Sequence, residues 1–205
     1  DELIILDTAS MTVSQSTPAG TFPTRVAWNP EGTRIIVSDR DGDRVYVYDF
    51  AGGTASLAGH IPTGDSPFDV VAMPGSDRAF VPNWGDSNVG VLDLASLSQT
   101  STIALPYRPM GASLSSDASE LRVGGGNGST TAGNGTFSET REGEMTVIDT
   151  TSLAVVDQVD IGQPVANAGA SADGSVIAFA SPSADGIVVA KEAVDCLADT
   201  NGDGM

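Results

Sequence analysis

The sequence is poor in cysteine and lysine: its 205 residues contain one of each, Cys196 and Lys191. A single cysteine excludes an internal disulfide, a CxxC zinc site and a CxxCH haem attachment. Aromatic residues make up 5% of the chain, and no apolar run approaches the roughly 18 residues that a transmembrane helix needs. The first residues, Asp1 to Ile5, lack the basic flank of a signal peptide, so we expect the leader of an exported protein to have been removed already.

Positive charge is also scarce. The chain has 27 acidic and 9 basic residues, which gives a formal net charge of −18. Such a surface repels nucleic acid and anionic lipid, attracts cations, and is typical of solubility in a salty or extracellular setting. We therefore expect no nucleic-acid partner and no membrane insertion. With 40% hydrophobic residues and a mean hydropathy of +0.02, the sequence predicts a globular chain with a sizeable core.

Residues 23–64 form one structural unit. This stretch holds four short runs of alternating apolar residues, and turn residues end each run. The pattern predicts a four-stranded antiparallel meander, with strands over residues 25–28, 34–38, 44–48 and 56–61.

Two sets of residues indicate that this unit recurs. Aspartates that end similar apolar runs are spaced by 42, 44 and 56 residues, and prolines that open the units are spaced by 44, 42 and 55 residues. The aspartates are Asp7, Asp49, Asp93 and Asp149, and the prolines are Pro23, Pro67, Pro109 and Pro164. The repeat is therefore about 43 residues long, with one Gly-rich insertion predicted at residues 124–143. We expect the aspartates to accept hydrogen bonds from backbone N–H groups two or three residues on, which is a structural role.

A four-stranded unit of this kind buries both faces of its sheet only between two neighbouring sheets. The sequence thus predicts an all-β fold, a β-propeller of four-stranded antiparallel blades. Residues 1–193 supply about four blades' worth of strands, and residues 194–205 form a linker with a truncated calcium loop. The two ends supply incomplete blades, so we expect either a fragment of a longer polypeptide or two copies that close a ring together.

The repeat resembles the YVTN family of β-propeller proteins. The residues that carry the resemblance are Pro67-Phe68-Asp69-Val70-Val71, Ala79-Phe80-Val81-Pro82-Asn83 and Val89-Gly90-Val91-Leu92-Asp93. It extends from Asp1 to about Lys191, and it implies a scaffold of the kind found in cell-surface proteins, lactonase-like enzymes and subunits of periplasmic dehydrogenases. An extracellular, cell-surface or periplasmic location is expected from this resemblance.

Two stretches are candidate calcium sites. Asp39, Asp41 and Asp43 alternate around a glycine between two predicted strands, and Ca²⁺ prefers several oxygen ligands on a tightly curved backbone. The flanking arginines favour the alternative of a solvated hairpin. In the tail, Asp199, Asn201 and Asp203 match the first half of the D-x-[DN]-x-[DN]-G loop and resemble the loops of dockerin-like and thrombospondin type 3-like repeats. The bidentate glutamate of such a loop would follow Met205.

The corresponding loop of the next repeat supplies candidate binding residues, Asn83, Trp84 and Asp86. Trp84 is predicted either to contact a ligand or to pack between blades.

Catalytic patterns are sparse. The only histidine, His60, falls in a predicted strand without a visible partner, and the sequence contains no nucleophile elbow. We therefore predict a non-catalytic secreted or periplasmic scaffold that binds other proteins or ligands through its rim of loops. Its expected partners are other protein chains, the rest of its own polypeptide or a second copy. The alternative is the propeller portion of an enzyme, either a lactonase-like hydrolase or a subunit of a periplasmic redox complex.

Overall fold

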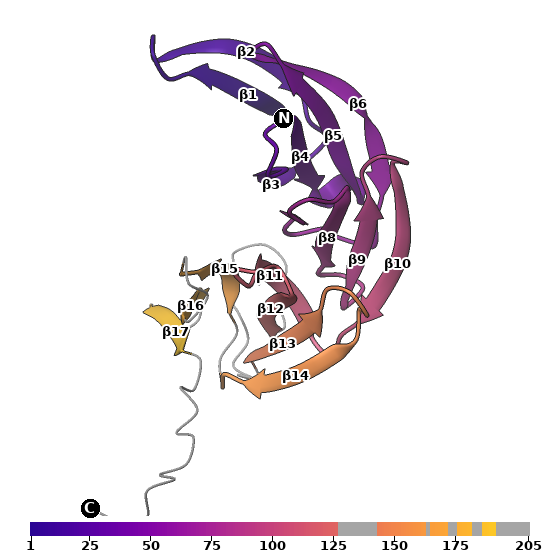
Figure 1. Ribbon diagram of the computed structural model, residues 1–205, viewed down its shortest axis with the longest axis vertical. Helices are drawn as coiled ribbons and strands as arrows, with labels where there is room; N and C mark the ends of the chain where they lie inside the picture. The colour runs from indigo at the N-terminus through magenta and orange to yellow at the C-terminus, as the bar shows by residue number, and fades with distance from the viewer. Residues whose placement is uncertain (127–142, 163–164, 172–175, 182–185, 192–205) are drawn as a thin grey trace, which may run out of the picture.

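A computed structural model describes residues 1–126, 143–162, 165–171, 176–181 and 186–191. These residues form five antiparallel sheets that follow one another along the chain and lie side by side on an open arc (Figure 1). In the described part of the chain the only helix is the short 3-10 turn η1 (Arg40–Gly42), and no helix there is long and apolar enough to cross a membrane.

Three of the sheets are complete four-stranded meanders. They consist of β3 (Pro23–Trp28), β4 (Arg34–Asp39), β5 (Arg44–Ala51) and β6 (Thr54–Pro62); β7 (Val71–Ala72), β8 (Arg78–Asn83), β9 (Asn88–Asp93) and β10 (Ser98–Ala104); and β11 (Arg108–Leu114), β12 (Glu120–Gly126), β13 (Gly143–Asp149) and β14 (Val155–Asp160). Each sheet points its first strand toward the centre of the arc and its fourth strand outward (Figure 1). This is the arrangement of blades in a β-propeller, as the repeat predicted.

The two ends of the arc are incomplete blades. The first sheet has only β1 (Glu2–Asp7) and β2 (Thr12–Pro18), and the last has β15 (Ala166–Ala170), β16 (Val176–Ser181) and β17 (Gly186–Lys191). The described strands therefore form a partial propeller, in agreement with the strand count predicted from the sequence.

The core lies between the sheets. In the described residues a separate cluster of buried apolar side chains fills each of the four interfaces between consecutive sheets. The alternation of strand side chains produces this arrangement, because successive residues point to opposite faces. In β8, Ala79 and Val81 pack toward the preceding blade, whereas Phe80 packs toward the following one. All three side chains are fully buried.

Hydrogen bonds from arginines also connect neighbouring blades. Arg34 Nη1 donates to the carbonyl oxygen of Leu94 at 2.5 Å, and Arg78 Nη1 donates to that of Thr150 at 2.6 Å. Both arginines begin the second strand of a blade, and both carbonyls follow the third strand of the next blade. The repeat in sequence thus places the same bond at two successive interfaces.

A single carboxylate joins three blades. Asp69, which is 2% exposed, pairs with Arg25 Nε of β3 at 3.0 Å, and its Oδ2 accepts a hydrogen bond from the N–H of Ala112 in β11 at 3.1 Å. Burial raises the pKa of Asp69 above its ordinary value, although Arg25 and the amide donors act in the opposite direction. A pKa raised in the folded state means that ionisation of this group weakens the fold as the pH rises through that pKa.

The aspartates that end the third strands behave as predicted in three of four blades. The Oδ1 atoms of Asp7, Asp93 and Asp149 each accept hydrogen bonds from backbone N–H groups two and three residues on. The amide donors, led by those of Ser10, Ser96 and Ser152 respectively, lower the pKa of each carboxyl. The prediction is wrong for Asp49, because β5 continues through Ala51 and this carboxylate instead pairs with Arg34 Nε at 3.3 Å.

The insertion begins later than its glycines suggested. β12 continues through Gly124, Gly125 and Gly126, and β13 begins at Gly143. A Cβ atom on Gly125 would lie 2.1 Å from the carbonyl oxygen of Arg108 and 2.7 Å from the Tyr107 ring, so this strand approaches β11 too closely for a side chain. All three glycines therefore lie in a strand rather than in a loop, and Gly125 serves its packing against the neighbouring strand.

Apolar side chains are exposed where the first sheet lacks its inner strands. Val26 and Trp28 of β3 are 53% and 47% exposed, although they lie opposite the buried Val37 and Ile35 of β4. The outer half of the same sheet face is covered by β1 and β2. Two further strands beside β1 would cover the inner half.

Replacement of Asp69 tests the connection among three blades. We expect Asp69→Ala to lower the free energy of unfolding by about 2 kcal/mol, because it leaves buried N–H donors without an acceptor. The control is Asp77→Ala, which removes an exposed carboxylate 3.4 Å from Arg34 and should cost less than about 1 kcal/mol. Urea denaturation measures both values, and equal losses would contradict the assignment.

Candidate binding face

The links between blades and the second loop of each blade lie on one face of the arc. We call it the link face; it comprises links 19–22, 63–68 and 105–108 and loops 40–44 and 84–87. Backbone hydrogen bonds hold the two sets together, such as Arg40 N to Phe22 O at 3.0 Å and Trp84 N to Ser66 O at 2.9 Å. The opposite face, which we call the turn face, carries the other turns of each blade.

Two of the three aspartates predicted to bind calcium accept hydrogen bonds from backbone N–H groups. Asp39 is buried, and its Oδ1 accepts hydrogen bonds from Thr21 N at 2.8 Å and Phe22 N at 2.7 Å. Asp43 accepts from Ser66 N at 2.9 Å. These carboxylates thus fix the links that precede β3 and β7.

Asp41 differs from its neighbours, because it is largely exposed and lies 3.8 Å from Arg40 Nε. Within the described ranges, no group of three or more His, Cys, Asp or Glu side chains is placed to hold a metal ion. Calcium binding by Asp39, Asp41 and Asp43 stays a prediction. The other predicted ligands, Asp199, Asn201 and Asp203, lie outside the described residues.

The three predicted binding residues of the next loop occupy different depths. Asn83 is fully buried, and its Nδ2 donates to Asn88 Oδ1 at 2.8 Å. Trp84 is half-buried, and Asp86 is exposed while its Oδ2 accepts from Asp65 N at 3.0 Å. Trp84 is therefore the residue of this set that offers both contact area and access to solvent.

Arginine and aromatic side chains contact one another across the link face. The guanidinium carbon of Arg108 lies 4.4 Å from the centroid of the Trp84 ring. That of Arg40 lies 5.6 Å from the Phe22 ring and 5.9 Å from the Phe68 ring. All three distances fall within the range of cation–π attraction, and Phe22 is 47% exposed.

These contacts recur by position in the repeat. Arg40 and Trp84 each follow the second strand of a blade directly. Their partners lie beside the prolines that open blades: Phe22 before Pro23, Phe68 after Pro67 and Arg108 before Pro109. The sequence pattern identified Trp84 but not the residue that it contacts. Equivalent positions of the repeat hold an arginine in one blade (Arg40) and an aromatic residue in the next (Trp84), so an alignment of the repeats does not show which residues pair.

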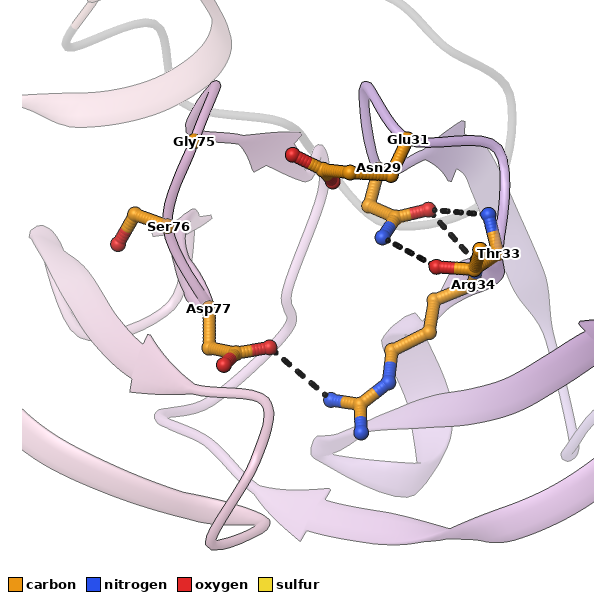
Figure 2. Close-up of a pocket in the computed structure, with 7 residues that line it drawn as sticks. All are labelled: Asn29, Glu31, Thr33, Arg34, Gly75, Ser76 and Asp77. Carbon is orange, nitrogen blue, oxygen red and sulfur yellow. Dashed lines mark hydrogen bonds and ion pairs between the residues drawn. The ribbon is translucent and has the colours of Figure 1, made fainter.

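The turn face carries an open pocket of about 410 Å³ between the first hairpins of two blades (Figure 2). Arg34 and Asp77 point toward each other across it at 3.4 Å. The Oδ1 of Asn29 accepts from the backbone N–H groups of Thr33 and Arg34. The main polar groups of this pocket thus bind one another, which favours a structural role.

His60 lies on the outer strand β6 and is exposed. Its ring centroid lies 6.0 Å from that of Tyr46, which is its cross-strand neighbour. The imidazole of His60 is therefore solvent-facing.

Comparison with known proteins gives information on the fold. No family model matches the chain, and no curated protein matches it in sequence. Its structure is similar to a solved chain of hydrazine synthase from Kuenenia stuttgartiensis, with a TM-score of 0.75 and 20% sequence identity. The similarity covers 87% of this chain and 49% of that one, so the chain spans about half the length of its structural neighbour. At this identity the similarity supports the all-β, propeller-like fold alone.

Replacement of Asp39 tests the role of the β4–β5 loop. We expect Asp39→Ala to lower the free energy of unfolding by about 2 kcal/mol with or without calcium, because two part-buried backbone amides lose their charged acceptor. Asp41→Ala, the exposed control, should change it by less than about 0.5 kcal/mol. Thermal melts in calcium and in chelator measure both. The opposite result would show that this loop binds an ion: chelator lowers the melting temperature of the wild-type protein, and Asp39→Ala leaves the free energy of unfolding unchanged.

Proposed function

We propose that the protein is a non-catalytic binding and assembly scaffold and that it binds protein partners or ligands through its link face. In this proposal it is related to YVTN propellers and located outside the cytoplasm. One observation carries this proposal: the link face presents a row of partly exposed aromatic and arginine side chains at successive blade boundaries. Tryptophan and arginine are enriched among the residues that dominate protein interfaces.

The positions of the YVTN-like residues support the relationship to that family. Pro23, Pro67 and Pro109 each lie at the opening of a blade. Asp93 ends a Val-rich third strand and accepts hydrogen bonds from the N–H groups of the following turn. The extracytoplasmic location rests on the same resemblance and on the net charge of −18.

Assembly would take place at the incomplete first blade. We propose that further β-strands, from a partner chain, a second copy or the same polypeptide, cover Val26 and Trp28 and pair with the open edge of β1. Exposed apolar surface next to an unpaired strand edge is a typical site of strand addition.

A capture experiment tests the link face. The wild-type protein, immobilised, should retain exported proteins or glycans of its source cells. A combined Phe22→Ser, Phe68→Ser and Trp84→Ser variant should retain at least about fivefold less, because it loses the apolar contacts. The matched control is a turn-face variant, Glu31→Ala with Asp77→Ala, which should retain the same set as wild type. Equal retention by all three proteins, with melting temperatures confirming the fold, would refute the proposal.

The alternative is the propeller portion of an enzyme. The hydrazine synthase chain is by name an enzyme, but at 20% identity its similarity concerns the fold alone. The scaffold proposal expects the purified protein to show no cofactor absorbance and no hydrolysis of lactone substrates above a His60→Ala control. A spectrophotometric assay decides between them: turnover that disappears in His60→Ala, while the melting temperature is unchanged, would favour the hydrolase.

A further inference from the structure

Most arginines of the described residues already have oxygen partners. Arg25 pairs with Asp69, and Arg122 pairs with Glu120 at 3.1 Å. Arg34 and Arg78 donate to carbonyl oxygens of neighbouring blades, and Arg44 Nε donates to Gly42 O at 2.7 Å. Because the chain has 27 acidic and 9 basic residues, we expect most arginines to have an oxygen partner.

Arg108 and Arg40 do not follow this pattern. Among the described residues, Arg108 has no carboxylate partner and no hydrogen-bond acceptor; its contact is the ring of Trp84 at 4.4 Å. Arg40 lies beside two phenylalanine rings, and its closest carboxylate oxygen, on Asp41, is 3.8 Å away. Its Nε is buried without a hydrogen-bond partner.

Contact with an aromatic ring leaves the guanidinium N–H groups available. The ring attracts the cation through its face and restricts the side chain, while the donors at the edge of the guanidinium plane can still bind a planar anion with two parallel hydrogen bonds. Because the side chain is already ordered, less conformational entropy is lost when the anion binds. Two such groups on one face of a protein with a net charge of −18 are therefore well placed for a ligand that brings its own negative charge.

The surrounding residues restrict the class of ligand. Asp65 and Asp86 are exposed on the same face, and the Asp41 side chain is 55% exposed, so a densely charged polyanion would be repelled. Phe22 and Trp84 offer apolar surface next to the guanidinium groups. A ligand with a single carboxylate next to an apolar group avoids the strong repulsion and can contact both the guanidinium groups and the apolar surface.

We propose, as a consequence of the link-face function above, that Arg108 and Arg40 bind a carboxylate carried beside an aromatic or aliphatic side chain, as in a peptide segment of a protein partner. Arg108 donates to the carboxylate while Trp84 contacts the neighbouring apolar group. Arg40, with Phe22 and Phe68, forms an equivalent position one blade away.

The probe is the blocked peptide acetyl-Phe-Glu-Phe-amide, compared with its Gln analogue. NMR titration of the whole chain follows the indole N–H signal of Trp84 and the Nε–H signals of Arg40 and Arg108. We expect the Glu peptide to shift these signals and to bind at least about tenfold more tightly than the Gln peptide, because the charged acceptor is lost in the analogue.

Variants connect the binding to the two arginines. Arg108→Gln should weaken binding of the Glu peptide about tenfold, and Arg108→Lys should restore only part of it, because lysine keeps the charge but not the planar fork. Arg44→Gln is the matched control: it removes one positive charge from the same face but neither arginine–aromatic contact, and it should weaken binding less than about threefold. Thermal melts verify that each variant is folded.

The outcomes separate this inference from the broader function. Equal affinity for the Glu and Gln peptides, or no binding of either, overturns the carboxylate site and leaves the capture experiment to judge the link face. Tighter binding of inorganic phosphate or of an oligogalacturonate than of the Glu peptide overturns the peptide ligand. Equal losses in Arg108→Gln and Arg44→Gln would reduce the effect to general electrostatics and also overturn the site.

Discussion

Burial of each sheet between its two neighbours is the constraint on which this structure depends. A single meander exposes two apolar faces, and the alternation of side chains in β8, where Phe80 packs one way and Ala79 and Val81 the other, requires a sheet on each side. The polar connections follow the same rule. Asp69 joins three blades, and Arg34 and Arg78 each reach a carbonyl of the next blade. Where a neighbour is missing, beside β1, apolar side chains remain exposed.

The same repeat produces two faces of different character. On the turn face, aspartates accept from their own turns and Arg34 lies among oxygen acceptors, so the polar groups are largely satisfied within the chain. On the link face, Arg40 and Arg108 contact aromatic rings instead. This contrast between satisfied and available hydrogen-bond donors supports the proposal that the link face binds ligands.

The fold was predictable from the sequence because period and alternation are local signals. The strands of residues 23–64, the turns after Asp7, Asp93 and Asp149, and the incomplete end blades all followed from spacing. The end of β5 could not be predicted from spacing, because a longer hairpin shifted Asp49 out of the turn. The extension of β12 could not be predicted either, since only the approach of Tyr107 and Arg108 explains why Gly125 lies in a strand.

The candidate site was less predictable. Trp84 stood out as a rare residue in a loop, but its contact with Arg108 joins residues of two different blades and has no signal in spacing. The partners of Asp39 show the same limit: the spacing of the aspartates carried no sign that Asp39 accepts hydrogen bonds from backbone amides of the preceding link. Packing of the sheets determines which side chains meet between two blades, and the sequence of one repeat does not specify these pairs.

Amide hydrogen exchange of a Val91→Ala variant tests the mutual dependence of the blades most directly. Val91 lies in β9, within the cluster shared with the next blade. The account predicts faster exchange both in β9 and across the interface in β12 and β13, with a smaller change in β4 and β5. Faster exchange confined to β7–β10 would show that each blade is stable alone, which would contradict the account.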